Sequence, residues 1–233
     1  MTLLVLSLCL AEPTASEDFT RERTSVAEVA SSFAALKTAV ATDLAQRRDP
    51  KIAARLLRQM RLVDQAARNA DPSDARTGRL MAAVDSYNLA TLKTLLTNVG
   101  WFDIPDYGEQ ADADAWLLVQ HADGDTGFQK DVLARLETRV PQKRTGRDHF
   151  AYLWDRVAVH EGRPQRYGTQ GKCVSNGRWE PDPLEDPSHV DERRAWANLY
   201  PGFQKLADYQ AVMSQTFCTI TVRSETRSAP RSR

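Results

Sequence analysis

Apolar residues recur every three or four positions along most of this chain, which predicts a mainly helical fold. The first such segment has its apolar positions at Val26, Val29, Phe33, Leu36 and Val40. Further helices are expected at residues 51–69, 75–98, 110–122, 126–140, 147–160 and 201–217, and one more after Asp186-Pro187. The connections between these segments are short, which favours a compact multi-helix bundle.

The periodicity changes between residues 165 and 179, where a small β-hairpin is expected. Tyr167, Thr169 and Cys173 precede Asn176-Gly177, and Asn-Gly is a strong signal for a two-residue hairpin turn. The fold class predicted from the sequence is therefore mainly α with one small hairpin.

The N-terminus has the pattern of an export signal. Residues 3–10 form an uncharged apolar run, and Cys9-Leu10-Ala11 places small residues at the −3 and −1 positions before Glu12. Residues 1–11 are therefore expected to be a signal peptide, although no Lys or Arg precedes the apolar run. We expect a secreted or periplasmic protein, or a cytoplasmic one if this run is not a signal.

The rest of the chain divides into three parts. Residues 12–23 are a polar lead, residues 24–218 are expected to form a single mainly helical domain, and residues 219–233 are expected to be a flexible, arginine-rich tail. No segment after the N-terminal run is long and apolar enough to span a membrane.

Removal of the signal would leave two cysteines, Cys173 and Cys218. An even number of cysteines suits a compartment in which disulfides persist. A bridge between them would tie the hairpin to the last helix, and the alternative is two unrelated thiols.

Net charge limits the class of partner. The chain has 31 Lys and Arg against 31 Asp and Glu, so it has no global field to attract nucleic acid. A small molecule or a peptide is the kind of ligand that we expect, and the oligomeric state is left open.

Polar residues are set among the apolar positions of the later helices. Gln120 and His121 lie three or four residues after Leu117, and Gln129 lies close to an apolar stripe in the next helix, so all three are expected to be buried. Buried amides and imidazoles are unfavourable unless their donors and acceptors find partners. These residues therefore predict either a satisfied internal network or a ligand pocket.

Asp155 and Arg156 are consecutive in a predicted helix, so their side chains leave it about 100° apart. They cannot readily pair with each other, and each needs a partner from elsewhere in the fold. Asp64 and Arg68 are four residues apart, in the favourable acid-before-base order. They are either an exposed helical pair or part of the same polar centre.

A set of short motifs resembles a bacterial domain family of unknown function over roughly residues 56–209. Gly100-Trp101 belongs to it, although Phe102 stands where proline is expected, so the loop there is expected to bend differently. The resemblance implies a mostly helical domain, often in exported proteins, and it implies no substrate. The other motifs that carry it are Met60, Asp64-Gln65, Arg68, Asp85, Asn88, residues 115–123 with Gln-His-Ala-Asp at 120–123, Phe128-Gln129, residues 151–153, Asp155-Arg156-Val157, and residues 165–170 with Tyr-Gly-Thr-Gln at 167–170.

Common catalytic and cofactor motifs are missing from the sequence. It has no HExxH, no P-loop, no GxGxxG, no CxxC pair and no GxSxG elbow. No cofactor is therefore expected. No metal site is expected either, because His121, Asp123 and His160 lack a local ligand spacing.

The remaining chemistry is acid–base catalysis by His121. Asp123 or Asp155 would orient the imidazole as a general base, and the reaction would be that of a hydrolase or transferase acting on an anionic or amide-bearing small ligand. The residues expected to bind that ligand are Gln120, Gln129, Arg156, Gln165, Tyr167, Gln170, Asp64 and Arg68.

The alternative is a non-catalytic binding or envelope interaction module in which the same polar residues are structural. In that case His121 bonds to a backbone carbonyl or to Gln129, and the segment 167–170 only docks on the bundle, with Gly168 allowing close backbone approach. Arg193 and Arg194 are expected to form a solvated face.

Overall fold

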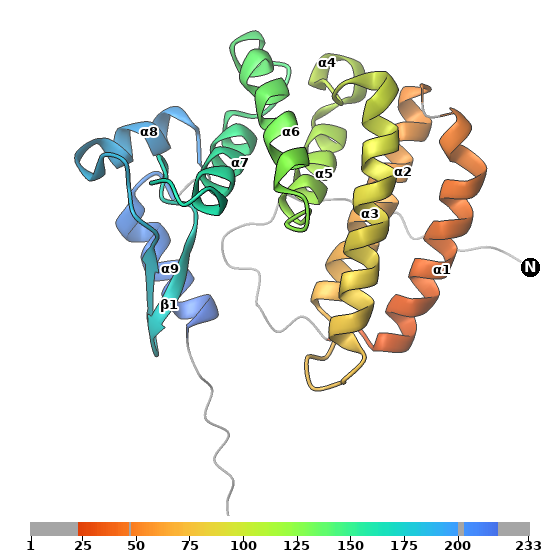
Figure 1. Cartoon of the computed structure of the whole chain (residues 1–233), viewed down its shortest axis with the longest axis horizontal. Helices are drawn as coiled ribbons and strands as arrows, with labels where there is room; N and C mark the ends of the chain where they lie inside the picture. Colours follow the sequence, from red (N-terminus) through yellow and green to blue (C-terminus); the bar gives the residue numbers. More distant parts are fainter. Residues whose placement is uncertain (1–22, 47, 200–202, 219–233) are drawn as a thin grey trace, which may run out of the picture.

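The computed structural model describes residues 23–46, 48–199 and 203–218, and this part of the chain is mainly helical with one small hairpin, which confirms the predicted fold class (Figure 1). The α-helices are α1 (Val26–Asp43), α2 (Pro50–Arg68), α3 (Thr77–Val99), α4 (Ile104–Tyr107), α5 (Glu109–Gln120), α6 (Thr126–Arg139), α7 (Arg147–His160), α8 (Val190–Trp196) and α9 (Leu206–Phe217). The strands are β1 (Gly171–Ser175) and β2 (Arg178–Pro181), and short 3-10 helices lie at η1 (Leu44–Gln46), η2 (Val140–Gln142) and η3 (Pro187–His189).

Side-chain caps explain where several helices begin. Ser25 and Glu28 form a reciprocal capping box at the start of α1. Asp49 accepts hydrogen bonds from the first amides of α2, where Pro50 occupies the position at which its missing N–H is no loss. Asp125 caps α6 in the same way. Helix boundaries predicted from periodicity therefore agree with the structure within a few residues.

The main core lies among the helices of the N-terminal and central parts. In Figure 1, α1, α2 and α3 lie on one side, the hairpin with α8 and α9 lies on the other, and α5, α6 and α7 lie between them. The fully buried side chains of this main core include Leu56, Leu57, Met60, Leu92, Leu95, Trp101, Phe102, Leu136 and Leu153. Burial of these side chains supplies most of the driving force for folding.

Phe102, at the position where proline was expected, is part of this core. It is fully buried, and its ring meets Tyr107 edge to face with centroids 5.3 Å apart. The loop before α5 is therefore held by aromatic packing and by the single turn of α4.

The hairpin and the last helix form a small separate cluster. β1 and β2 are antiparallel around the turn at Asn176-Gly177, and a Cys173–Cys218 disulfide with a Cα separation of 5.4 Å joins β1 to the end of α9. The predicted bridge is thus present in the structure. Trp179 and Tyr209 pack beside Cys218.

Two boundaries in this part differ from the prediction. Residues 165–170 are not part of the hairpin: Gln165 forms an isolated parallel bridge with Leu184, and side chains hold much of the remaining backbone, as described below. The predicted helix after Asp186-Pro187 consists of η3 followed by α8, and α9 begins at Leu206 instead of near residue 201.

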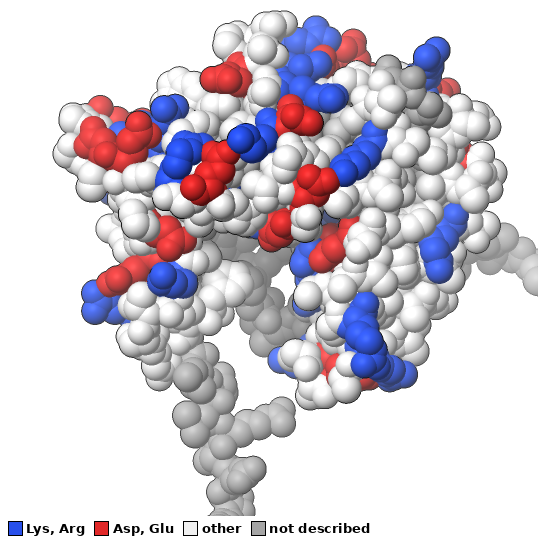
Figure 2. Space-filling view, viewed as in Figure 1, with Lys and Arg blue, Asp and Glu red and all other residues white. Residues whose placement is uncertain are grey.

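The predicted signal peptide, most of the polar lead and the tail at 219–233 lie outside the described residues. Within the described ranges, no helix combines the length and the apolar character that crossing a membrane requires. Figure 2 shows acidic and basic side chains interspersed over the face that it presents.

Candidate functional site

His121, at the end of α5, is held by a buried carboxylate of α2. Nδ1 of His121 lies 2.8 Å from Oδ2 and 3.0 Å from Oδ1 of Asp64. The Asp64 side chain is 1% exposed, whereas the His121 side chain keeps 20% of its surface exposed. The expected orienting partners, Asp123 and Asp155, are replaced by Asp64, which lies 57 positions earlier in the chain.

The hydrogen bonds around Nδ1 determine the tautomer of the neutral ring. Arg68 Nε also lies 2.9 Å from Nδ1 of His121, but a nitrogen that donates to Asp64 cannot accept from Arg68. An unprotonated Nδ1 would set its lone pair against the carboxylate, so we assign the proton to Nδ1. Nε2 of the neutral ring is then free of a proton and can accept one.

Arg68 links two carboxylates beside the imidazole. Its guanidinium contacts Asp64 at 3.3 Å and Asp85 of α3 at 2.7 Å, and Nη1 lies 3.6 Å from the sulfur of Met81. Asp64 and Arg68 are therefore not an exposed helical pair. Gln65 completes the surroundings of Asp64 with a hydrogen bond of 2.8 Å.

The pKa values of Asp64 and Asp85 are shifted in opposite directions. Burial disfavours ionised Asp64, but the hydrogen bond from His121 and the charges of His121 and Arg68 outweigh burial and hold the pKa of Asp64 below its ordinary value. Burial raises the pKa of Asp85 above its ordinary value, against the attraction of Arg68 and with the repulsion of Asp64. Asp85 therefore accepts a proton more readily than Asp64 does.

A second group of polar side chains follows directly in the chain. Arg156 of α7 donates to Gln120 at 2.8 Å and to both oxygens of Asp123 at 2.7 and 2.9 Å. Gln129 of α6 donates to Asp123 at 3.2 Å and to the carbonyl of Val119 at 3.0 Å. The segment 120–123 therefore joins this group to the group around His121. The two groups together are called the polar centre below, and its residues are Asp64, Arg68, Asp85, Gln120, His121, Asp123, Gln129 and Arg156.

Some polar atoms of these helices have no partner within the described chain. They include both amide atoms of Asn88, Nε2 of Gln120 and Oε1 of Gln129, and the buried atoms Oε1 of Gln59, Oδ2 of Asp114 and Nε1 of Trp116, outside the polar centre, are in the same state. Buried polar atoms without partners are unfavourable by about 1–3 kcal/mol each.

Asp155 takes part in a different network. Its carboxylate accepts hydrogen bonds from the backbone amides of Arg166, Tyr167 and Thr169 at 2.8 to 3.2 Å, and from the Thr169 hydroxyl at 2.9 Å. Burial nevertheless raises the pKa of Asp155 above its ordinary value, because the amides only partly offset it. Its oxygens are thus already bound by the 165–170 loop.

Gln165 and Gln170 also hold this loop. The Gln165 amide donates to the carbonyls of Gln170 and Asp182 and accepts from the Gln170 amide, at 2.8 to 2.9 Å. Nε2 of Gln170 donates to the Thr169 hydroxyl at 3.0 Å. Both residues were predicted to bind a ligand; in the structure the Gln165 side chain binds backbone groups of Gln170 and Asp182, and the Gln170 side chain binds the Thr169 hydroxyl.

Arg194 corrects the prediction of a solvated face. It is fully buried, and its guanidinium donates to the carbonyls of Tyr167 at 2.6 Å and Phe203 at 2.5 Å. Arg193 is only partly exposed and donates to the carbonyl of Arg166 at 2.7 Å. Arg193 and Arg194 bind carbonyl groups of the 165–170 loop, and Asp155 binds its amide groups. The loop is therefore held through both its N–H and its C=O groups.

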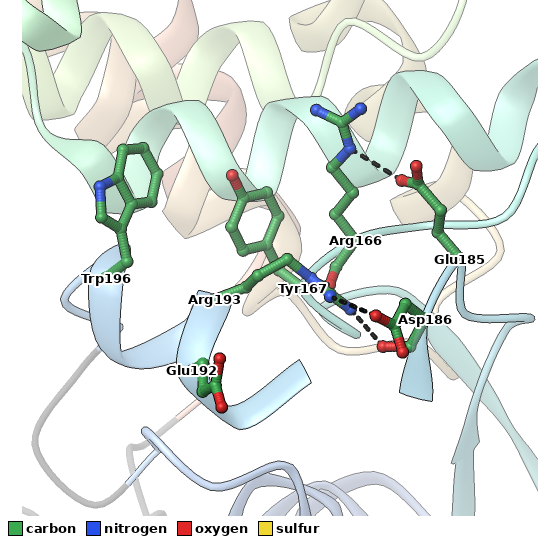
Figure 3. A pocket seen from close by; sticks show the side chains of 7 residues that line it. All are labelled: Arg166, Tyr167, Glu185, Asp186, Glu192, Arg193 and Trp196. Carbon is green, nitrogen blue, oxygen red and sulfur yellow. Dashed lines mark hydrogen bonds and ion pairs between the residues drawn. The ribbon is translucent and has the colours of Figure 1, made fainter. Parts of the chain in front are cut away.

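Tyr167, a predicted ligand residue of this loop, lines a cavity. The cavity has a volume of about 510 Å³ and is bordered by Arg166, Tyr167, Glu185, Asp186, Glu192, Arg193 and Trp196 (Figure 3). None of the polar-centre residues is among them. The structure therefore distributes the predicted site residues over the polar centre, this cavity and the network of Asp155, Gln165 and Gln170 that holds the 165–170 loop.

A buried histidine–carboxylate pair was missed by the sequence reasoning. Asp112 is fully buried and accepts from Trp101 Nε1 at 2.6 Å, from the Thr145 hydroxyl at 2.8 Å and from His149 Nδ1 at 2.8 Å. The His149 ring stacks on Trp116 at 4.6 Å. Nothing local in the sequence connects these residues, which come from three separate segments.

Metal ligands are not grouped in the part of the chain that the structure describes. No three His, Cys, Asp or Glu side chains there are placed to hold one ion. His160 lies 3.9 Å from Asp123, and Asp123 is engaged by Arg156.

Residues 49–219 match the model of a family of unknown function, which confirms the resemblance to an uncharacterised domain family. No curated protein and no solved structure matches the chain. The match covers the polar centre, the 165–170 loop and the cavity.

Proposed function

The chain belongs to the family of unknown function DUF6624, and we propose that its polar centre is the active site of a hydrolase or transferase with His121 as general base. The observation that carries the proposal is the contact of His121 Nδ1 with the buried carboxylate of Asp64, on a ring that remains partly exposed. A carboxylate on Nδ1 orients the ring and stabilises the imidazolium that forms when Nε2 takes a proton.

The cations around His121 indicate the substrate class. Arg68 and Arg156 contribute two guanidinium groups, whose side chains are 28% and 23% exposed and whose hydrogen-bonded groups are connected through the segment 120–123. Guanidinium groups bind carboxylates and phosphates through paired N–H donors. We therefore propose an anionic or amide-bearing small molecule as substrate, and an anionic group would bind by displacing the carboxylates that Arg68 and Arg156 contact in the free protein.

Asp85 supplies a second titrating group for this chemistry. It contacts the same Arg68 that contacts Asp64, and its raised pKa favours the protonated acid more than an ordinary aspartate does. A pair of groups whose environments separate their pKa values suits general acid and base roles. His121 would take the proton from the attacking hydroxyl group or water, and protonated Asp85 would donate a proton to the leaving group.

Export remains part of the proposal. The apolar run at residues 3–10 and the small residues before Glu12 favour cleavage after Ala11. The Cys173–Cys218 disulfide is compatible with an oxidising compartment. To test export, the protein would be expressed in a bacterial host and the N-terminus of the mature chain sequenced. We expect Glu12 to be the first residue. An intact Met1 on protein in the cytosol would contradict export.

The test of the active site combines binding with turnover. Thermal shift would be measured with phosphate, citrate, acetate and several phosphate monoesters, and hydrolysis would be followed with p-nitrophenyl phosphate and p-nitrophenyl acetate. We expect at least one anion to raise the melting temperature and Arg156→Ala to remove that shift. We expect His121→Gln to keep anion binding and to lower turnover by about 10²- to 10⁴-fold.

Asp64→Asn and a remote histidine provide the controls. Asp64→Asn keeps the shape but loses the charge that stabilises the imidazolium, so turnover is expected to fall while the fold is retained. His189→Ala changes an exposed histidine of η3, far along the chain from the polar centre, and is expected to leave turnover unchanged. Equal turnover in wild type and His121→Gln would exclude His121 as the base.

A non-catalytic module is the second candidate, and one observation favours it. Arg156 and Gln129 both donate to Asp123, and Arg68 contacts Asp64 and Asp85, so the charged groups of the polar centre are largely paired internally. This candidate predicts that no anion shifts the melting temperature, that both model substrates are inert, and that His121→Ala and Arg156→Ala destabilise the fold. That combined result would reject the enzyme proposal.

A further inference from the structure

The cavity beside Tyr167 is a second candidate binding site, separate from the polar centre. Three segments line it: the 165–170 loop, the turn after β2 and the helix α8. In Figure 3 the side chains of Trp196 and Tyr167 lie side by side, and Arg166 and Arg193 reach toward Glu185 and Asp186. We propose that this cavity binds a neutral carbohydrate.

The walls of the cavity are fixed before any ligand arrives. Arg166 donates to Glu185 at 2.8 Å, and Arg193 donates to the carbonyl of Asp186 at 2.5 Å. The loop that carries Tyr167 is held by Asp155 through its amides and by Arg194 through its carbonyls. A rigid wall loses little conformational entropy on binding, which favours recognition of a small ligand.

Aromatic surface is the first feature that selects a sugar. Trp196 is 45% exposed, which is unusual for an indole in a chain with a well-filled core. Its ring is nearly parallel to that of the buried Tyr167, with an angle of 22° and centroids 6.4 Å apart, and the Arg147 guanidinium lies 5.7 Å from its centroid, so the exposed part of the indole is the aromatic surface on offer. Aromatic faces carry partial negative charge and attract the weakly positive C–H groups that one face of a pyranose presents.

Charge balance is the second feature. Arg166 is paired with Glu185 and Arg193 lies 3.8 Å from Asp186, so each cation at the rim has a carboxylate beside it. With Glu192 the lining holds three carboxylates and two guanidinium groups, so an anionic ligand would be repelled by the carboxylates and a cationic ligand would meet the guanidinium groups. A neutral polyol avoids both kinds of repulsion.

The paired groups also offer the right hydrogen-bonding partners. Arginine supplies only donors and a carboxylate supplies only acceptors, whereas each sugar hydroxyl is both a donor and an acceptor. Glu192, four residues before Trp196 on α8, adds a further carboxylate to the lining. The cavity thus combines an aromatic surface with fixed donors and acceptors at its edge, a combination that orients a ligand as well as binding it.

The test uses glucose, N-acetylglucosamine, cellobiose and maltose as neutral probes, with choline and glucose 6-phosphate as charged comparisons. Binding to the full chain would be followed by tryptophan fluorescence and by saturation-transfer NMR. We expect at least one neutral sugar to bind at millimolar concentration and to bind more tightly than both charged probes. Trp196→Ala is expected to weaken it at least about tenfold.

Phe217→Ala is the matched control, because Phe217 is an exposed aromatic residue outside the cavity lining. It is expected to bind the sugar as the wild type does, with far-ultraviolet circular dichroism confirming that both variants fold. Glu192→Gln separates the ligand classes, since it removes a charge that a cation needs and keeps an acceptor that a sugar uses. Tighter binding of choline or glucose 6-phosphate, no sugar binding, or sugar binding unaffected by Trp196→Ala would overturn the proposal.

Discussion

Asp155 and Arg156 are neighbours in α7, and their side chains serve two different networks. The Asp155 carboxylate binds three backbone amides of the 165–170 loop, whereas the Arg156 guanidinium binds Gln120 and Asp123. Because successive helical residues point about 100° apart, α7 separates the polar centre from the loop. One helix thus organises both candidate sites.

Replacement of Asp155 tests whether it holds the loop. Asp155→Asn exchanges one acceptor oxygen for an NH₂ group that faces amide donors, so we expect a loss of about 2–4 kcal/mol in the free energy of unfolding. Urea unfolding measures this loss. Asp131→Asn, on the exposed surface of α6, is the control and is expected to change stability by less than about 0.5 kcal/mol. A similarly small effect for Asp155→Asn would mean that the four contacts contribute little.

Stability is expected to depend on the protonation of His149. Burial opposes its charged form, but the hydrogen bond to Asp112 and the charges of Asp148 and Asp112 outweigh burial and raise the pKa of His149. A group whose pKa is higher in the folded state than in the unfolded state gives its full stabilisation at pH values below the unfolded-state pKa. That stabilisation is lost as pH rises through the folded-state value.

The measurement is the free energy of unfolding from about pH 5 to about pH 9 for wild type and His149→Gln. The wild type is expected to lose stability relative to the variant as pH rises across the histidine range. Parallel pH profiles in the two proteins would show that His149 does not titrate as described.

Gly168 is expected to tolerate no side chain. Its φ is +65°, and a Cβ there would lie 2.9 Å from Cδ1 of Leu206. Gly168→Ala therefore combines backbone strain with overpacking and is expected to lower the free energy of unfolding by about 1–3 kcal/mol. Gly124→Ala is the matched control, because no atom lies within 4 Å of its added Cβ. Equal stability of the two variants would contradict the close packing of the loop on α9.

Loss of the disulfide is expected to weaken the C-terminal cluster. The bridge closes a separation of 45 residues, for which the loop-entropy model gives about 4 kcal/mol. We expect the double variant Cys173→Ser with Cys218→Ser to melt at a lower temperature, and reduction of the wild type to have the same effect. Alkylation of both thiols without prior reduction would show that the bridge does not form.

The helices and the hairpin turn were predictable because their signals are local. Apolar spacing, Asp49-Pro50 and Asn176-Gly177 each act within a few residues, so the helix positions and the turn follow without knowledge of the rest of the chain. The burial of Gln129 was predictable for the same reason, since it lies beside an apolar stripe.

The partners of the polar residues were not predictable from local signals. His121 finds Asp64 from a helix 57 positions away, although Asp123 stands two residues from it. Arg194 is charged and was expected on a solvated face, yet the carbonyls of Tyr167 and Phe203 receive its N–H groups in the interior. Such satisfaction of a buried charge depends on which backbone groups the fold brings near.

The amino-acid sequence alone determined the helical class, the hairpin turn, the direction in which Asp155 and Arg156 diverge, and the family to which the chain belongs. Tertiary structure decided that Asp64 orients His121, that Gln165 and Asp155 hold a loop, and that Tyr167 and Trp196 share a cavity away from the polar centre. The physical reason is range: periodicity and capping act over one or two helical turns, whereas hydrogen-bond partners and cavities depend on how distant segments pack.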